Sequence, residues 1–150
     1  MDQNNHRSRL PMRARVATTV GGAAATVSRL AGRDGSVIGG IIGLRLEPGL
    51  LALLAAGRQV ILVTGTNGKT TTTRLITAAL TPLGQEIASN IYGANMEAGL
   101  TSALSRAPDA PIAVLETDEK YIPAMVKATN PKVVVLLNLS RDQMDRAAEI

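Results

Sequence analysis

The sequence feature that most constrains the fold is a short apolar segment that runs through two glycines into a segment with helical spacing. Residues 60–73 read V-I-L-V-T-G-T-N-G-K-T-T-T-T. The β-branched and aliphatic run at 60–63 is typical of a strand buried on both faces of a parallel sheet. A strand that leads directly into a helix favours an α/β fold. The predicted apolar face of that helix, over residues 69–83, consists of Leu75, Ile76, Ala79, Leu80 and Leu83.

The same alternation of strand and helix continues down the chain. Four strands joined by helices predict a three-layer α/β fold around a parallel sheet of the P-loop type. The segment 142–150 has the pattern of the start of another helix, so we expect the domain to be incomplete at its C-terminus. After the first strand and helix, the predicted elements are a strand at 87–89, a helix over 97–106, a strand at 112–116, a helix over 121–128 and a strand at 133–138.

The N-terminal third divides into two parts. Residues 1–13 are polar and rich in arginine, which predicts a disordered basic tail. Residues 14–57 form a helical and glycine-rich leader to the domain at 58–150. Within this leader we expect a glycine-rich loop or irregular strand at 32–43 and a short helix over 49–56.

The first part of the leader combines helical spacing with glycines that disfavour a helix. Four apolar side chains follow one another at nearly helical spacing, but Gly21 and Gly22 count against one unbroken helix. The apolar positions are Val16, Val20, Val27 and Leu30.

The net charge of +4 is unevenly distributed. Residues 1–33 hold six arginines and one acidic residue, whereas residues 34–150 hold ten basic and eleven acidic residues. The excess positive charge fits either a solvated tail or a segment attracted to an anionic membrane surface. The arginines that would hold the protein near the membrane are Arg7, Arg9, Arg13 and Arg15.

Composition narrows the classes of function. The chain has no cysteine, so it offers no disulfide and no thiolate ligands, and zinc is not assignable within these residues. Two tyrosines are the only aromatic residues, which disfavours a single-stranded nucleic-acid binder. No apolar run approaches the length of a membrane span, and the polar start does not resemble a secretory signal. We therefore expect a cytoplasmic protein, peripheral to the membrane if the arginines bind there.

The glycine turn has the chemistry of a phosphate-binding loop. Gly65 and Gly68 allow the backbone to close around phosphate oxygens, and the start of the following helix favours an anion. Lys69 is placed to reach the β- and γ-phosphates of ATP, and the Thr70 hydroxyl is placed to bind Mg²⁺. The alternative is a structural turn with a solvent-facing lysine. The predicted ATP phosphate-binding residues are Gly65, Thr66, Asn67, Gly68, Lys69, Thr70 and Thr71.

Polar side chains follow the predicted strands where ligands of parallel sheets gather. Glu116 ends the third strand, followed by Asp118 and Glu119. We predict that Glu116 faces the loop that carries Lys69 and that these two residues are catalytic. The loop asparagines fit substrate or phosphate contacts and Asx turns equally well. The possible contacts after the second and fourth strands are Asn90, Asn95, Asn138, Asp142 and Asp145.

These motifs resemble the Mur ligase family. The segment 65–71, G-T-N-G-K-T-T, is similar to the phosphate loop of these enzymes, and Val63 stands where a general P-loop has its first glycine. The resemblance implies the central ATPase domain of a Mur ligase, with ATP and Mg²⁺ as cofactors and Glu116 as the metal-binding glutamate.

Further motifs are similar to the MurT branch of this family, the Mur-like subunits of lipid II isoglutaminyl synthases. These motifs are S-N-x-x-G-A-N-M at 89–96, L-E-x-D-E-K-Y at 115–121 and R-D-Q-x-D-R at 141–146. The last one has Gln143 where amino-acid-adding Mur ligases have a metal-binding histidine, which puts a second metal site in doubt.

The MurT resemblance implies amidation of the D-glutamate α-carboxylate of lipid II to D-isoglutamine, with an acyl phosphate intermediate and ammonia from a GatD-like glutaminase partner. It also implies action at the inner membrane surface. Two alternatives remain open at this point. One is an amino-acid-adding Mur or folylpolyglutamate-type ligase, and the other is a non-catalytic nucleotide-binding fragment.

Overall fold

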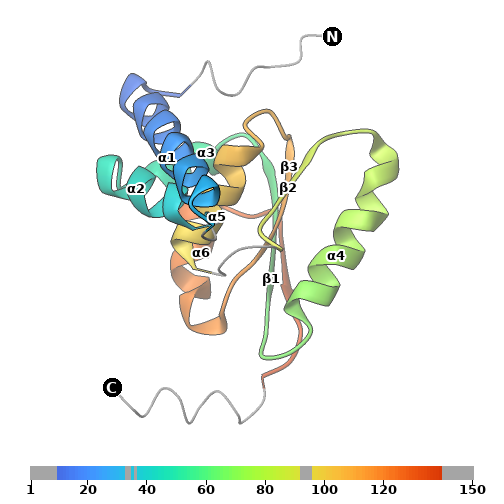
Figure 1. Cartoon of the computed structure of the whole chain (residues 1–150). Coiled ribbons are helices and arrows are strands. Elements are labelled where there is room, and N and C mark those ends of the chain that lie inside the picture. Colours follow the sequence, from blue (N-terminus) through green and yellow to red (C-terminus); the bar gives the residue numbers. More distant parts are fainter. Residues whose placement is uncertain (1–9, 33–34, 36, 92–95, 140–150) are drawn as a thin grey trace.

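The computed structural model describes residues 10–32, 35, 37–91 and 96–139, and its centre is a four-stranded parallel sheet (Figure 1). The strands lie in the order β2-β3-β1-β4, and every neighbouring pair is parallel. This confirms the predicted α/β class and the parallel sheet. The strands are β1 (Gln59–Thr64), β2 (Ile87–Ser89), β3 (Ile112–Glu116) and β4 (Val133–Leu136).

Helices cover both faces of the sheet (Figure 1). On one side, α4 (Lys69–Leu80) packs over a small apolar cluster that includes Val63 and Val114. On the other side lies the main core, which α3 (Leu50–Ala55), α5 (Glu97–Arg106) and α6 (Ile122–Thr129) cover. Alternate residues of one strand point to opposite faces, so β1 supplies Val63 to the first cluster and Leu62 to the main core. The layered arrangement is the predicted one.

The buried face of α4 differs from the predicted one. Leu75 and Leu83 are exposed, at 65% and 59%, and Ala79 is exposed as well. Ile76 and Leu80 pack against the sheet as expected, and the residue one turn before them on that face is the fully buried Thr73. The helix ends at Leu80 and is followed by a 3₁₀ turn over Thr81–Leu83. Side-chain spacing alone did not reveal which face of the helix is buried.

The leader consists of two longer helices, α1 (Met12–Leu30) and α2 (Ile38–Leu46), ahead of α3. The predicted loop or irregular strand at 32–43 is therefore wrong over most of α2, and α1 is unbroken at its glycines. Close packing explains both corrections. A Cβ atom at Gly21 would overlap the Gly39 carbonyl oxygen, and a Cβ atom at Gly40 would overlap that of Ala98 in α5. The glycines bring helices together rather than ending them.

The boundary between the tail and α1 lies earlier than expected. The helix begins at Met12, so Met12 and Arg13 belong to it, and Leu10 is already buried. Residues 1–9, which carry the rest of the predicted tail, lie outside the described residues. Within the described part of the chain, no helix is long and apolar enough to cross a membrane.

A buried arginine fastens the leader to the domain. The Arg58 guanidinium donates hydrogen bonds to the carbonyl oxygens of Leu54, Ala107, Pro108 and Ala110 at 2.7–2.9 Å. Burial lowers the pKa of Arg58, while the charges of Glu86 and Asp109 oppose that shift. Because four carbonyls are satisfied by one side chain, Arg58 holds the end of α3 against the turn that precedes β3.

Candidate nucleotide-binding site

The predicted phosphate loop is a tight turn between β1 and α4. Gly65 has a φ of +138° and Gly68 has a φ of +86°, a region that favours glycine. Space is restricted as well, because a Cβ atom at Gly65 would lie 2.9 Å from the carbonyl oxygen of Asn138. Both glycines are thus required by the backbone path of the turn.

Asn138, just past β4, holds this turn in place. The Thr66 N–H donates to the Asn138 carbonyl oxygen at 2.7 Å, and the Asn67 N–H donates to Asn138 Oδ1 at 3.1 Å. Asn138 Nδ2 donates in return to the Asn67 carbonyl oxygen at 3.2 Å. Asn138 therefore positions the loop. Its predicted contact with substrate or phosphate stays a prediction.

The Lys69 ammonium lies inside the turn. Its Nζ donates to the carbonyl oxygens of Gly65 at 2.6 Å and Thr66 at 3.2 Å, and it lies 3.5 Å from Asp118 Oδ1. The side chain is only 10% exposed, which contradicts the alternative of a solvent-facing lysine. The positive charge is thus concentrated where the backbone of the loop curves.

The first turn of α4 is open to an anion. Gly68 occupies the N-cap position, and no side chain caps the helix. Lys69 and Thr70 are half-buried in the first turn, and Thr71 is exposed. Because the first backbone N–H groups of a helix have no partner within the helix, this end favours a phosphate group.

Glu116 lies next to the loop, at the end of the central strand β3. It pairs in register with Val63 of β1, and it is 6% exposed. Its Oε2 atom is buried and has no hydrogen-bond partner. A buried carboxylate oxygen without a partner is costly, and it is well suited to a hard cation. The residues present therefore fit Mg²⁺.

Asn90 fixes the backbone of Glu116. Asn90 Nδ2 donates to the Glu116 carbonyl oxygen at 2.9 Å, and the Glu116 N–H donates to Asn90 Oδ1 at 2.8 Å. Asn90 is fully buried and lies one residue past β2. Its side chain thus extends the pairing of β2 with β3 by one step. From the sequence we expected either a substrate or phosphate contact or an Asx turn at Asn90, and not this bond to Glu116.

Two further polar groups at this edge were not predicted. Thr64 ends β1 and Ser89 ends β2, and the hydroxyl oxygen of each is buried without a hydrogen-bond partner. The signal that singled out Glu116, a polar residue at the carboxyl end of an apolar strand, also applies to both. Three neighbouring strands therefore present unpartnered oxygens at one edge of the sheet.

A cavity of about 370 Å³ opens beside the loop. Glu119 lies in its wall with Gly65, Ile122 and Leu137. Glu119 Oε1 accepts a hydrogen bond from the Thr66 hydroxyl at 3.4 Å, and Oε2 is buried without a partner. The structure thus brings Glu119 to the loop, whereas Asn95, Asp142, Gln143 and Asp145 lie outside the described residues and stay predictions.

The parallel sheet and the loop around Lys69 define a phosphate-loop protein of the α/β class. The chain belongs to the Mur ligase family, because the family model described as "Mur ligase middle domain" matches residues 63–150.

Among curated proteins, the chain is similar to subunit MurT of a glutamine-hydrolysing lipid II isoglutaminyl synthase in two organisms. It is 41% identical to the subunit of Staphylococcus aureus (strain COL) over 126 residues, which are 82% of this chain and 29% of the relative. It is 35% identical to the subunit of Streptococcus pneumoniae (strain ATCC BAA-255 / R6) over 139 residues, 83% of this chain and 31% of the relative. The chain thus spans about a third of these relatives.

A second kind of relative adds an amino acid. The chain is 38% identical to the UDP-N-acetylmuramate–L-alanine ligase of Mycobacterium bovis (strain BCG / Pasteur 1173P2) over 100 residues, 67% of this chain and 19% of the relative. The similarity to MurT covers more of the chain than the family model does, so it includes part of the leader.

Proposed function

We propose that the chain is the ATP-binding part of a ligase that amidates the D-glutamate residue of lipid II. The α-carboxylate attacks the γ-phosphorus of ATP, which releases ADP and forms an acyl phosphate. Ammonia then attacks the acyl carbon, phosphate leaves, and the product is D-isoglutamine. The observation that carries the proposal is the Lys69 ammonium held inside the glycine turn after β1, with an unpartnered Glu116 oxygen at the end of the neighbouring strand β3.

The chain's own residues have distinct roles in this proposal. The backbone N–H groups of the loop and of the first turn of α4 bind the phosphates of ATP, and Lys69 offsets the charge that develops on the transferred phosphoryl group. The substrate carboxylate is the nucleophile, so no side chain of this chain needs to form a covalent intermediate. Lys69 would exchange its bonds to the Gly65 and Thr66 carbonyls for phosphate oxygens.

Mg²⁺ would be held by the Thr70 hydroxyl and by Glu116. It would neutralise charge on the β- and γ-phosphates when bound. Asn90 and Asn138 act through other groups, because Asn90 holds the backbone of Glu116 and Asn138 holds the backbone of the loop. Both are positioning residues.

The choice of substrate rests on similarity. The MurT relatives share 35–41% identity with more than four fifths of the chain, and the motifs at 89–96 and 115–121 resemble that branch. On this basis we propose a glutaminase partner of the GatD kind and a reaction at the cytoplasmic side of the membrane that carries lipid II. A second candidate is the addition of an amino acid, which the 38% identity to an L-alanine-adding ligase favours.

The test is an amidation assay on the full-length protein, co-purified with its candidate glutaminase. Lipid II, ATP, Mg²⁺ and glutamine are supplied, and the product is identified by mass spectrometry. We expect a carboxyl-to-amide mass change that requires both ATP and glutamine. The addition of an amino-acid residue instead would move the protein to the second candidate. ATP turnover with neither product would refute both.

A further inference from the structure

The outer side of α1 carries an apolar stripe along its whole length. Because the apolar positions follow one another at steps of three, four and seven residues, they share one face of the helix. The helix packs through its opposite face, where the small residues Ala14, Ala17 and Gly21 are buried. Figure 1 places α1 on the side of the sheet away from α4. The stripe consists of Met12, Val16, Val20, Val27 and Leu30, which are between 43% and 84% exposed.

The side of α1 that packs against the rest of the protein is made of small residues. The apolar residues at helical spacing in residues 14–31 lie on the outer side, whereas the core side of α1 is made of alanine, glycine and serine. An apolar face that is not used for packing within the described residues normally marks a contact with something else.

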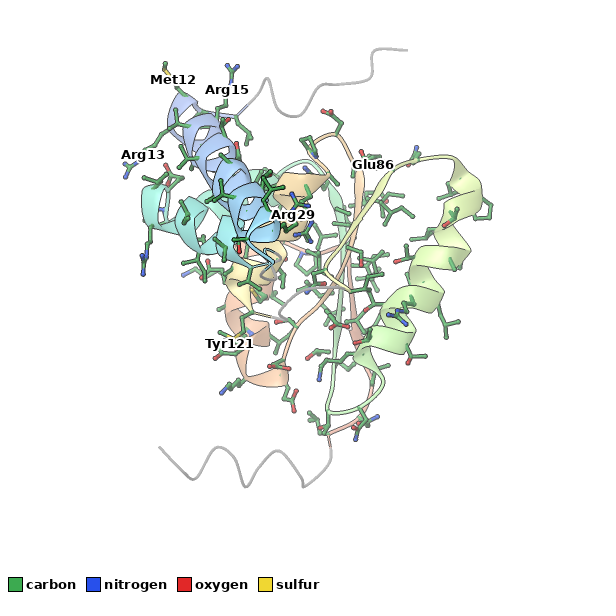
Figure 2. The ribbon with its side chains drawn as sticks, viewed as in Figure 1. Met12, Arg13, Arg15, Arg29, Glu86 and Tyr121 are labelled. Carbon is green, nitrogen blue, oxygen red and sulfur yellow. The ribbon has the colours of Figure 1, made fainter. Side chains whose placement is uncertain are left out.

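The charged residues of α1 itself are all positive. The described helix has Arg13, Arg15 and Arg29 and no acidic residue. Figure 2 shows Met12, Arg13 and Arg15 projecting outward from the beginning of α1. Arg13 lies 3.5 Å from Glu47 and donates to the Leu46 carbonyl oxygen, but its side chain is still 72% exposed. Arg29 donates hydrogen bonds within its own helix, to the carbonyl oxygen of Ala25 and to the Thr26 hydroxyl.

We propose that α1 docks on an anionic lipid surface. The stripe inserts at the boundary between headgroups and acyl chains, and the arginines contact the headgroups. An apolar face flanked by arginine is the composition of a helix that lies in a membrane interface. The arginines also select against the self-association of two copies through this face, because like charges would meet across a symmetric contact. Residues 1–33 together hold six arginines and one acidic residue, which adds long-range attraction to the same surface.

We expect neither the apolar stripe nor the arginines alone to attach the protein to a membrane. Valine, methionine and leucine side chains reach only a short distance into a membrane. Stable attachment to a membrane generally requires an apolar and a basic signal together. Binding should therefore require anionic lipid and decrease as salt screens the arginines. The proposal does not depend on the ligase reaction, because α1 contributes no residue to the candidate site.

The test is binding of the full-length protein to vesicles, measured by co-sedimentation. The vesicles contain either phosphatidylglycerol with phosphatidylcholine or phosphatidylcholine alone. The variant Val16→Ser/Val20→Ser/Val27→Ser removes the centre of the stripe, and serine has a helix propensity similar to that of valine. Leu75→Ser is the matched control, because Leu75 is 65% exposed on α4. Lys69→Ala, which should abolish the ligase reaction, is expected to bind vesicles like the native protein.

We expect the native protein and Leu75→Ser to bind the phosphatidylglycerol vesicles, and the triple variant to bind at least about tenfold more weakly. Equal binding by the triple variant, or no binding by the native protein, would overturn the proposal. A dye attached at Val20→Cys tests whether protein rather than lipid covers the stripe. If the dye is shielded from a soluble quencher before vesicles are added, the stripe is covered by protein, and the proposal fails. Sedimentation velocity then shows whether the protein that covers the stripe is a second copy of the chain or another part of the same chain.

Discussion

Replacing Asn90 by alanine should have two effects: it should destabilise the protein, and it should leave Glu116 less well positioned in the candidate metal site. The substitution leaves the backbone N–H and carbonyl groups of Glu116 without the bonds of 2.8 and 2.9 Å that they make to Asn90. Glu116 is only 6% exposed, so water replaces these partners poorly. A buried backbone group left without a partner costs about 1–3 kcal/mol, and two of them together with the lost packing should lower the free energy of unfolding by about 2–4 kcal/mol.

Two measurements check this prediction in the full-length protein. Urea unfolding gives the loss of stability, and an Mg²⁺ titration of ATP turnover reports on the carboxylate that Asn90 positions. We expect Asn90→Ala to need more Mg²⁺ for half-maximal turnover even under conditions where it is fully folded. Gln85→Ala, which removes an exposed amide just before β2, is the control and should change neither. If Asn90→Ala lowers stability by less than about 0.5 kcal/mol and leaves the Mg²⁺ requirement unchanged, Asn90 does not position Glu116.

Three further predictions concern the site and the packing around it. Glu116→Gln keeps the size of the side chain but removes its charge, and should raise the Mg²⁺ needed for half-maximal ADP formation at least about tenfold; an unchanged titration would remove Glu116 from the metal site. Arg58→Met removes the four hydrogen bonds that the guanidinium donates to carbonyl oxygens, and should lower the free energy of urea unfolding by about 2–4 kcal/mol without changing activity per folded molecule. Gly40→Ala would press against the Ala98 carbonyl and should cost about 1–3 kcal/mol in the same assay, whereas Gly22→Ala, in open space, should stabilise by about 0.5–1 kcal/mol. Equal effects of the two alanines would contradict the packing of α2 described here.

The sequence predicted the elements whose patterns are complete within themselves. The helix over 97–106 and the strand at 112–116 have the predicted boundaries, because each is a periodic segment enclosed by turn residues. The glycine turn of the predicted phosphate loop was recognisable because a strand, two glycines and a lysine must follow one another in the chain to make such a turn. All the information for these features is local.

The features that the sequence did not reveal depend on contacts between distant segments. The glycines of α2 suggest a loop until α1 and α5 are seen packed against them. The role of Asn90 depends on the neighbouring strand β3, which lies 26 residues away along the chain at Glu116. In the same way, Asn138 anchors a loop 71 residues before it. Side-chain type suggested that these asparagines matter, but only the fold assigns each to its partner.

Hydroxylamine trapping tests most directly whether the phosphate loop uses ATP to activate a carboxylate. Full-length protein is incubated with lipid II, ATP, Mg²⁺ and hydroxylamine, which converts an acyl phosphate into a stable hydroxamate. We predict hydroxamate with the native protein and with Lys132→Ala, an exposed lysine that precedes β4, and none with Lys69→Ala or without ATP. Hydroxamate formation that persists in Lys69→Ala, or that does not need ATP, would contradict the account.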